Sequence, residues 1–194
     1  MKTVSRRDVL KSLSRGVVAG SVLRVIPAEA AAYAHALIQA DKTAGTFKPK
    51  YFSDHQYKTL RALCQAIIPA DGNSGGAVEA GAPEFIDLLT SENPDYQLVL
   101  GGGLMWLDGI CTDRFGHNYI DCTSAQMTSL LDLIAYRKNA MIDPSVSQGI
   151  EFFSFLRNLT LDGFFTSEIG IKYLGYIGNT HLKDFPGCPP VTEA

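Results

Sequence analysis

Helix start signals recur along this chain, and apolar residues at helical spacing follow them. Ser53 and Gln56 form a capping box, in which each side chain satisfies a backbone N–H that the first helical turn leaves free. Thr123 and Gln126 repeat the pattern. No stretch alternates apolar and polar residues as a half-buried strand does. The sequence therefore predicts an all-α fold, a small irregular helical bundle.

The apolar residues behind these starts predict which helix faces enter the core. After Ser53 they recur three and four positions apart until Pro69, whose missing N–H cannot continue the helix. Pro83 and Asn93-Pro94 mark further helix starts, where Glu84 and Asp87 would favour the positive end of the first of them. Residues 151–159 are apolar almost all round, which predicts a buried helix. The first apolar stripe consists of Tyr57, Leu60, Leu63, Cys64, Ile67 and Ile68.

Three consecutive glycines at residues 101–103 interrupt the helical pattern between Tyr96 and Cys111. Each costs about 1 kcal/mol relative to alanine in a helix interior. The glycines mark either a break in the helix or a place where another part of the chain packs closely. A phosphate-binding loop is disfavoured, because both the GK[ST] ending and the GxGxxG spacing are missing. Beyond Gly163, glycines, aromatics and prolines predict an extended C-terminal tail.

The first thirty residues match a twin-arginine export signal. A short, weakly apolar stretch at residues 17–23 and a small-x-small cleavage site at Ala28-Glu29-Ala30 follow the arginine pair. That stretch is shorter than the roughly 20 apolar residues a membrane-spanning helix needs. We therefore assign residues 1–30 to a signal peptide, 31–50 to a linker and 51–194 to a helical domain, and we expect a periplasmic location. An uncleaved anchor and an ordinary amphipathic helix are the alternatives. The signal residues are Ser5, Arg6, Arg7, Leu10 and Lys11.

Composition excludes several function classes for the part beyond the signal. Residues 1–30 hold six lysines or arginines and two acids, so the remainder is more acidic than the chain's net charge of −3 suggests. An acidic body does not attract phosphate backbones, which argues against nucleic-acid binding. A hydrophobic content of 46% suffices for the core of one domain.

Recognisable catalytic and cofactor motifs are missing from the sequence. No cysteine stands in a CxxC or CxxCH motif, and there is no GxSxG nucleophile elbow. The four histidines share no metal-ligand spacing, so each is expected to be structural, and His55 to be solvated or capping. A buried Asp108 or Asp162 would need a partner. We therefore predict no catalytic, cofactor-binding or metal-binding residue on this chain. The histidines are His35, His55, His117 and His181.

The chain thus carries the export signal of a cofactor protein without a cofactor motif, and a partner would reconcile the two. Besides the leader, five stretches carry a recognisable pattern: residues 60–71 (LRALCQAIIPAD), 79–81 (EAG), 85–87 (FID), 153–167 (FSFLRNLTLDGFFTS) and 173–188 (YLGYIGNTHLKDFPGC). With these stretches the chain resembles the gluconate 2-dehydrogenase subunit 3 family, the small subunits of bacterial membrane-associated flavin dehydrogenases.

The resemblance implies a mostly helical accessory subunit without a redox centre. It implies a large FAD-containing partner of the glucose–methanol–choline type, which oxidises gluconate, a sugar or a polyol. In many members of the family a multihaem cytochrome c subunit passes the electrons on. The small subunit would escort the flavoprotein through the twin-arginine pore and stabilise it, and would associate with the inner membrane through its partners. The rival hypotheses are an independent exported enzyme and a periplasmic binding or scaffold domain.

Two sets of residues follow as candidates for assembly. Aromatic residues near the C-terminus exceed what a small core needs, and aromatic residues anchor interfaces, so we expect them to contact the flavoprotein. Cys111 and Cys122 are close enough in sequence to close a short loop by an intrachain disulfide, while Cys188 could pair with the large subunit and Cys64 stays a free thiol. Four reduced cysteines are the alternative. The candidate interface consists of Phe164, Phe165, Tyr173, Tyr176 and Phe185.

Overall fold

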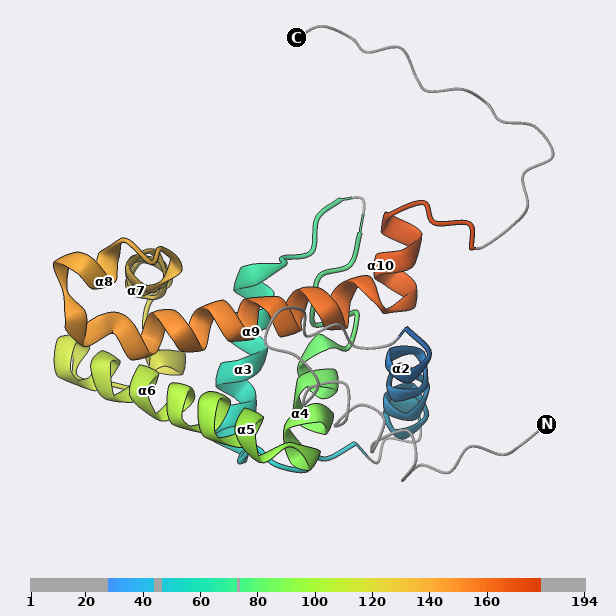
Figure 1. Cartoon of the computed structure of the whole chain (residues 1–194), viewed down its shortest axis with the longest axis horizontal. Helices are drawn as coiled ribbons and strands as arrows, with labels where there is room; N and C mark the ends of the chain where they lie inside the picture. The colour runs from blue at the N-terminus through green and yellow to red at the C-terminus, as the bar shows by residue number, and fades with distance from the viewer. Residues whose placement is uncertain (1–27, 44–46, 73, 179–194) are drawn as a thin grey trace, which may run out of the picture.

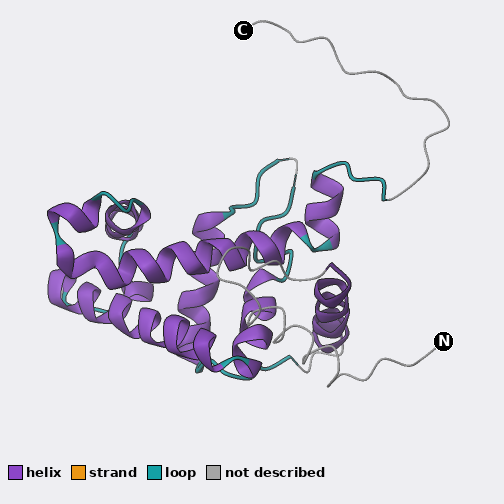
Figure 2. Cartoon of the chain, in the orientation of Figure 1, coloured by secondary structure: helices purple, strands orange, loops and turns teal. Residues whose placement is uncertain are grey.

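The computed structural model describes residues 28–43, 47–72 and 74–178, and these residues form a bundle of helices. Helices and loops account for all of this described part, which contains no strand (Figure 2). The all-α prediction is confirmed. The export signal lies outside the described residues, and so do residues 179–194 of the predicted tail. The extended tail predicted beyond Gly163 is corrected in its described part, because one helix runs to Phe165 and another covers Glu168–Tyr173.

Most helices are short, and one long helix crosses the bundle (Figure 1). In chain order the α-helices are α2 (Ala28–Thr43), α3 (Asp54–Ile67), α4 (Ala82–Glu92), α5 (Pro94–Tyr96), α6 (Gly102–Phe115), α7 (Ser124–Ala135), α8 (Asn139–Ile142), α9 (Ser147–Phe165) and α10 (Glu168–Tyr173). A π-helical turn, η1 (Gln97–Gly101), precedes α6, and the 3-10 turns are η2 (Tyr119–Asp121) and η3 (Pro144–Val146).

Helix α9 is the centre of the bundle. It contacts α3, α4, α6, α7 and α10. Phe152 and Leu156 are among its fully buried side chains, as the apolar sequence predicted. Helices α7 and α8 lie near one end of α9 and α10 lies at the other (Figure 1).

The capping-box helix starts and the stop at Pro69 are confirmed, whereas the buried helix expected at residues 151–159 extends from Ser147 to Phe165. The Ser53 amide donates to Gln56 Oε1 at 3.1 Å, and the Gln56 amide donates to Ser53 Oγ at 3.3 Å. Thr123 and Gln126 form the same pair of bonds at 2.8 and 3.3 Å. Helix α3 ends at Ile67, shortly before Pro69. These elements are fixed by contacts within a few residues, so the local sequence suffices to predict them.

Helix α4 carries a buried carboxylate that organises the chain in front of α3. Asp87 is 1% exposed and accepts hydrogen bonds from three consecutive backbone amides. Its Oδ2 accepts from Lys50 at 2.6 Å, and its Oδ1 accepts from Tyr51 and Phe52 at 3.1 Å each. Three charge-assisted bonds offset the burial of one carboxylate, and they leave no amide of this segment unpaired. Asp87 therefore does more than favour the positive end of its own helix.

The linker predicted for residues 31–50 is corrected over most of its length, because Ala28–Thr43 forms α2. Its buried residues Ala30, Ala31, Ala34 and Ile38 recur at helical spacing and join the core. Small alanine side chains let a helix approach its neighbours closely. Composition alone suggested a linker because alanine carries little apolar signal of its own.

The glycine run is a site of close packing and not a break. Residues 97–101 form the π-helical turn, and α6 continues directly from it. A Cβ on Gly103 would overlap the Phe152 ring of α9, and one on Gly149 would overlap the Trp106 ring of α6. Each helix thus receives an aromatic ring of the other helix at one of its own glycines, where it has no side chain. Of the two interpretations of the run, close approach is correct.

This packing predicts opposite effects for two glycines of the same helix. Gly103→Ala places a methyl group where Phe152 lies, so overpacking should lower the free energy of unfolding by about 1–3 kcal/mol or more. Gly109→Ala meets no atom within 4 Å and should stabilise α6 by roughly 0.5–1 kcal/mol. Urea unfolding of both variants beside the wild type measures the difference. Equal stabilities would refute the close-packing account.

Candidate functional site

Exposed apolar side chains concentrate at the end of α9, on α10 and on the residues that follow it. They are between 36% and 69% exposed. Single exposed apolar residues are ordinary on a protein surface, but a run of them on adjoining elements marks an interaction site. We call this set the C-terminal apolar face. It consists of Leu161, Phe165, Ile171, Tyr173, Leu174, Tyr176 and Ile177.

A tight turn between α9 and α10 holds this face in shape. Ser167 caps α10, with its Oγ accepting from the Gly170 amide at 3.1 Å and donating to the Phe164 carbonyl at 2.7 Å. Gly170 packs directly on that carbonyl, where a Cβ would overlap it. The short helix therefore turns off steeply from the end of α9, as Figure 1 shows.

The predicted interface residues divide into three groups. Phe165, Tyr173 and Tyr176 are exposed on the C-terminal apolar face. Phe164 is only 3% exposed, so its assignment to the interface is corrected. Its ring packs edge to face on Phe165 at 5.1 Å between centroids and lies 6.2 Å from Tyr173, so it supports the face from below. Phe185 lies outside the described residues.

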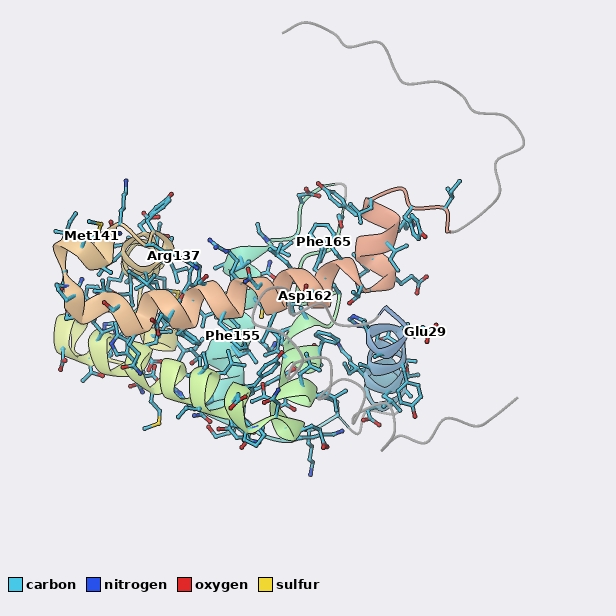
Figure 3. The ribbon with its side chains drawn as sticks, in the orientation of Figure 1. Glu29, Arg137, Met141, Phe155, Asp162 and Phe165 are labelled. Carbon is cyan, nitrogen blue, oxygen red and sulfur yellow. The ribbon has the colours of Figure 1, made fainter. Side chains whose placement is uncertain are left out.

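Asp162 lies on α9 between Leu161 and Phe165 of this face, and Figure 3 shows it near Phe165. Its side chain is half-buried, and burial raises its pKa. Among the described residues no ion pair offsets that burial. A cation brought by a partner would find an incompletely compensated carboxyl beside exposed apolar surface.

Helix α2 docks on the same end of the molecule through His35. The imidazole Nε2 lies 3.0 Å from Thr166 Oγ1, and the ring stacks on Phe85 with 5.1 Å between centroids. Burial lowers the pKa of His35. A hollow of about 230 Å³ adjoins it, and Gln39, Glu79 and Glu168 are among the residues that line it. The contacts support the structural role expected for His35.

A second buried carboxylate of α4 links α2 to α3. Glu84 is 1% exposed, and its Oε1 lies 3.1 Å from Lys42 Nζ and 3.6 Å from Arg61. Burial raises the pKa of the nearby Tyr57 hydroxyl, and the charge of Glu84 adds to the effect. Losing one partner of such a buried ion pair is strongly destabilising, because the remaining charge stays buried. Glu84 therefore fixes the arrangement of three helices.

His55 and Asp108 form a hydrogen-bonded pair of a structural kind. His55 Nε2 lies 2.6 Å from Asp108 Oδ2, and Asp108 Oδ1 accepts from the Tyr119 amide at 3.0 Å. The pair connects α3, α6 and η2, and it gives the partly buried Asp108 carboxylate a partner. His55 is thus not simply solvated or a helix cap, as the sequence suggested.

Within the described residues no cluster of three or more His, Cys, Asp or Glu side chains could hold a metal ion. In the same part of the chain, no helix combines the length and the apolar character needed to cross a membrane. The chain's lack of a cofactor remains a prediction.

Three of the four cysteines are described, and all three are buried free thiols. Burial raises the pKa of Cys64 to about 12, and its sulfur lies 3.6 Å from Thr160 Oγ1. Cys111 and Cys122 are neighbours, and both are reduced in this structure. The intrachain disulfide between them therefore stays a prediction. Cys188 lies outside the described residues.

The model of the gluconate 2-dehydrogenase subunit 3 family matches residues 54–187, which is more than half of the chain. The chain therefore belongs to that family, as the sequence motifs indicated. The name describes one subunit of a dehydrogenase and so implies a multi-subunit complex. No curated protein and no solved structure matches the chain.

The buried histidine predicts a pH dependence of stability. The pKa of His35 is lowered in the folded state. Below pH 6.5, the ordinary pKa of this imidazole, the unfolded chain therefore binds more protons than the folded chain. Stability is therefore retained above about pH 6.5 and lost as the pH falls below it, by at most about 1.4 kcal/mol per pH unit. His35→Gln should flatten this decline while keeping a hydrogen bond to Thr166.

Thermal unfolding of both proteins between pH 8 and pH 5 measures the difference. Every other titrating group is present in both, so the difference between the two curves reports His35 alone. Parallel curves would contradict the assignment.

Proposed function

We propose that this chain is the non-catalytic small subunit of a membrane-associated, FAD-dependent dehydrogenase that oxidises gluconate, a sugar or a polyol. It binds the flavoprotein subunit, stabilises it and escorts it through the twin-arginine pathway to the periplasm. Membership of the family supports the role of a subunit. The export motif at Arg6 and Arg7 supports the escort role.

The C-terminal apolar face is the observation that carries the proposal. It combines two exposed tyrosines and one exposed phenylalanine with aliphatic side chains, the mixture that anchors protein interfaces. All its residues fall within the part of the chain that the family model matches. The flavoprotein subunit is the occupant that family membership favours.

A second exposed apolar group, at the other end of α9, is the weaker candidate. Met141 and Ile142 on α8 are exposed, and so are Tyr136 and the cations Arg137 and Lys138 just before α8. Figure 3 shows Met141 and Arg137 at this end of the molecule. This group is smaller and contains one aromatic residue. It therefore serves as a matched control.

The proposal assigns the chemistry to other chains. FAD belongs to a large subunit of the glucose–methanol–choline type, and haem c belongs to a cytochrome subunit that passes electrons on. Membrane association is through these partners. The residues of this chain bind, orient and protect, and none is assigned to catalysis.

Substitutions on the C-terminal apolar face should weaken the binding of this chain to the flavoprotein subunit. The double variant Phe165→Ala with Tyr176→Ala should reduce co-purification of the flavoprotein at least tenfold, because truncating interface anchors costs about 2 kcal/mol or more each. The control pair Met141→Ala with Ile142→Ala should leave it unchanged. An affinity pulldown from membranes, with the flavin of the eluate quantified, measures both. Full co-purification of the flavoprotein with the Phe165→Ala, Tyr176→Ala variant would refute the assignment of this face as the interface.

Substitutions in the leader should retain both chains in the cytoplasm. Arg6→Lys with Arg7→Lys keeps the charge but removes the planar guanidinium groups. We expect the small subunit and the flavoprotein to accumulate together in the cytoplasmic fraction. Arg15→Lys with Arg24→Lys, in the same segment, should leave export intact. Cell fractionation with immunoblots for both chains decides, and normal export of the first pair would refute the escort role.

A further inference from the structure

Two thiols from neighbouring elements meet beneath the surface at the end of α6. Cys111 lies in the last turns of α6, and Cys122 follows η2 directly. Both are buried free thiols on elements that pack together. Burial raises the pKa of Cys111, and Cys122 is near enough to raise it further. Nothing in the proposed function uses either sulfur.

The backbone between them is built to keep the two thiols together. Gly116 ends α6 with φ of 83°, a left-handed conformation that reverses the chain. Asp108 Oδ1 then accepts from the Tyr119 amide at 3.0 Å, which ties η2 back to α6 one turn before Cys111. The Cys122 amide donates to the Tyr119 carbonyl at 3.1 Å. The juxtaposition of the thiols thus follows from a braced turn and not from proximity in sequence alone.

The two sulfurs have different surroundings. Cys122 is 8% exposed, whereas Cys111 is fully buried, so an external reagent meets Cys122 first. Cys122 Sγ lies 3.5 Å from His117 Nδ1 and 3.5 Å from the Asn118 carbonyl. A ring nitrogen at this distance can take the thiol proton and leave the nucleophilic thiolate. Cys122 is therefore placed to react first and Cys111 to complete the reaction.

We propose that Cys111 and Cys122 form a redox pair that closes to an intrachain disulfide when the folded chain meets a thiol-oxidising protein. The Cys122 thiolate attacks one sulfur of the oxidant's disulfide, and the other sulfur of that disulfide leaves as a thiolate. The Cys111 sulfur, after losing its proton, attacks Cys122 Sγ and releases the oxidant's remaining sulfur. Two electrons and two protons pass to the oxidant, whose disulfide becomes a dithiol.

The bond would lock the turn that holds η2 on α6. It closes a loop of about a dozen residues, for which chain entropy predicts a melting temperature roughly 5–10 °C higher in the oxidised protein. In the same turn the Tyr119 amide donates to the Asp108 carboxylate of α6, which pairs with His55 of α3. The site of oxidation in the cell rests on the proposed export, because stable disulfides form outside the cytoplasm.

The test separates the chemistry from the location. Full-length purified protein is equilibrated in glutathione buffers of increasing oxidised fraction, alkylated and digested for mass spectrometry. The expected product is a peptide pair that links Cys111 to Cys122 and lacks two hydrogens. It should vanish in Cys111→Ser and in Cys122→Ser and persist in Cys64→Ser. The oxidised wild type should melt higher, whereas oxidised Cys122→Ser should show no rise.

A second arm applies the same alkylation to cytoplasmic and periplasmic fractions. Linked peptide confined to the periplasmic fraction supports both the pair and the export proposal. Linked peptide in the glutathione series but in neither fraction supports the pair and counts against export. Absence of the linked peptide from the glutathione series, or a predominant bond to Cys64 or Cys188, would overturn the inference.

Discussion

The hydrogen bonds from three successive amides to Asp87 are the constraint on which the arrangement of the chain depends. They fix the segment before α3 against α4, a helix whose residues 82–90 are all buried. On the same helix, Glu84 pairs with Lys42 of α2 and Arg61 of α3. Helix α4 in turn packs on α9. One short buried helix thus positions three others. Backbone amides and basic side chains offset the burial of its two carboxylates.

The parts of the fold that local chemistry determines could be predicted from the sequence. Ser53 with Gln56, and Thr123 with Gln126, specify helix starts within four residues, and the structure has both. The sequence indicates only that Asp87 favours the positive end of its own helix. The hydrogen bonds of Asp87 are missed, because they reach residues more than thirty positions away. Such pairing requires knowing which helices meet, which no pattern of spacing reveals.

The candidate site shows the same division between local and distant information. The sequence predicts that aromatic residues near the C-terminus form an interface. A helix predicted to end at residue 159 gives no sign that Phe164 is buried. Helix α9 continues to Phe165, and Phe164 then follows Leu156 and Thr160 on the buried side at helical spacing. Carrying the helical period to residue 165 would have distinguished Phe164 from Phe165. The buried docking of α2 had no comparable signal, because its core residues are mostly alanines.

The two proposed sites occupy different ends of the molecule and depend on different physical properties. The C-terminal apolar face covers α10 and the end of α9, whereas Cys111 lies in the last turns of α6. That end of α6 is near α7 and α8 (Figure 1). Between them, the α6–α9 contact is rigid, because Phe152 and Trp106 rest on glycines that leave no space for adjustment. A disulfide that tightens the η2 turn would therefore stabilise one end of the bundle without reshaping the face at the other. Oxidation would raise the stability of the chain while its surface for a partner stays the same.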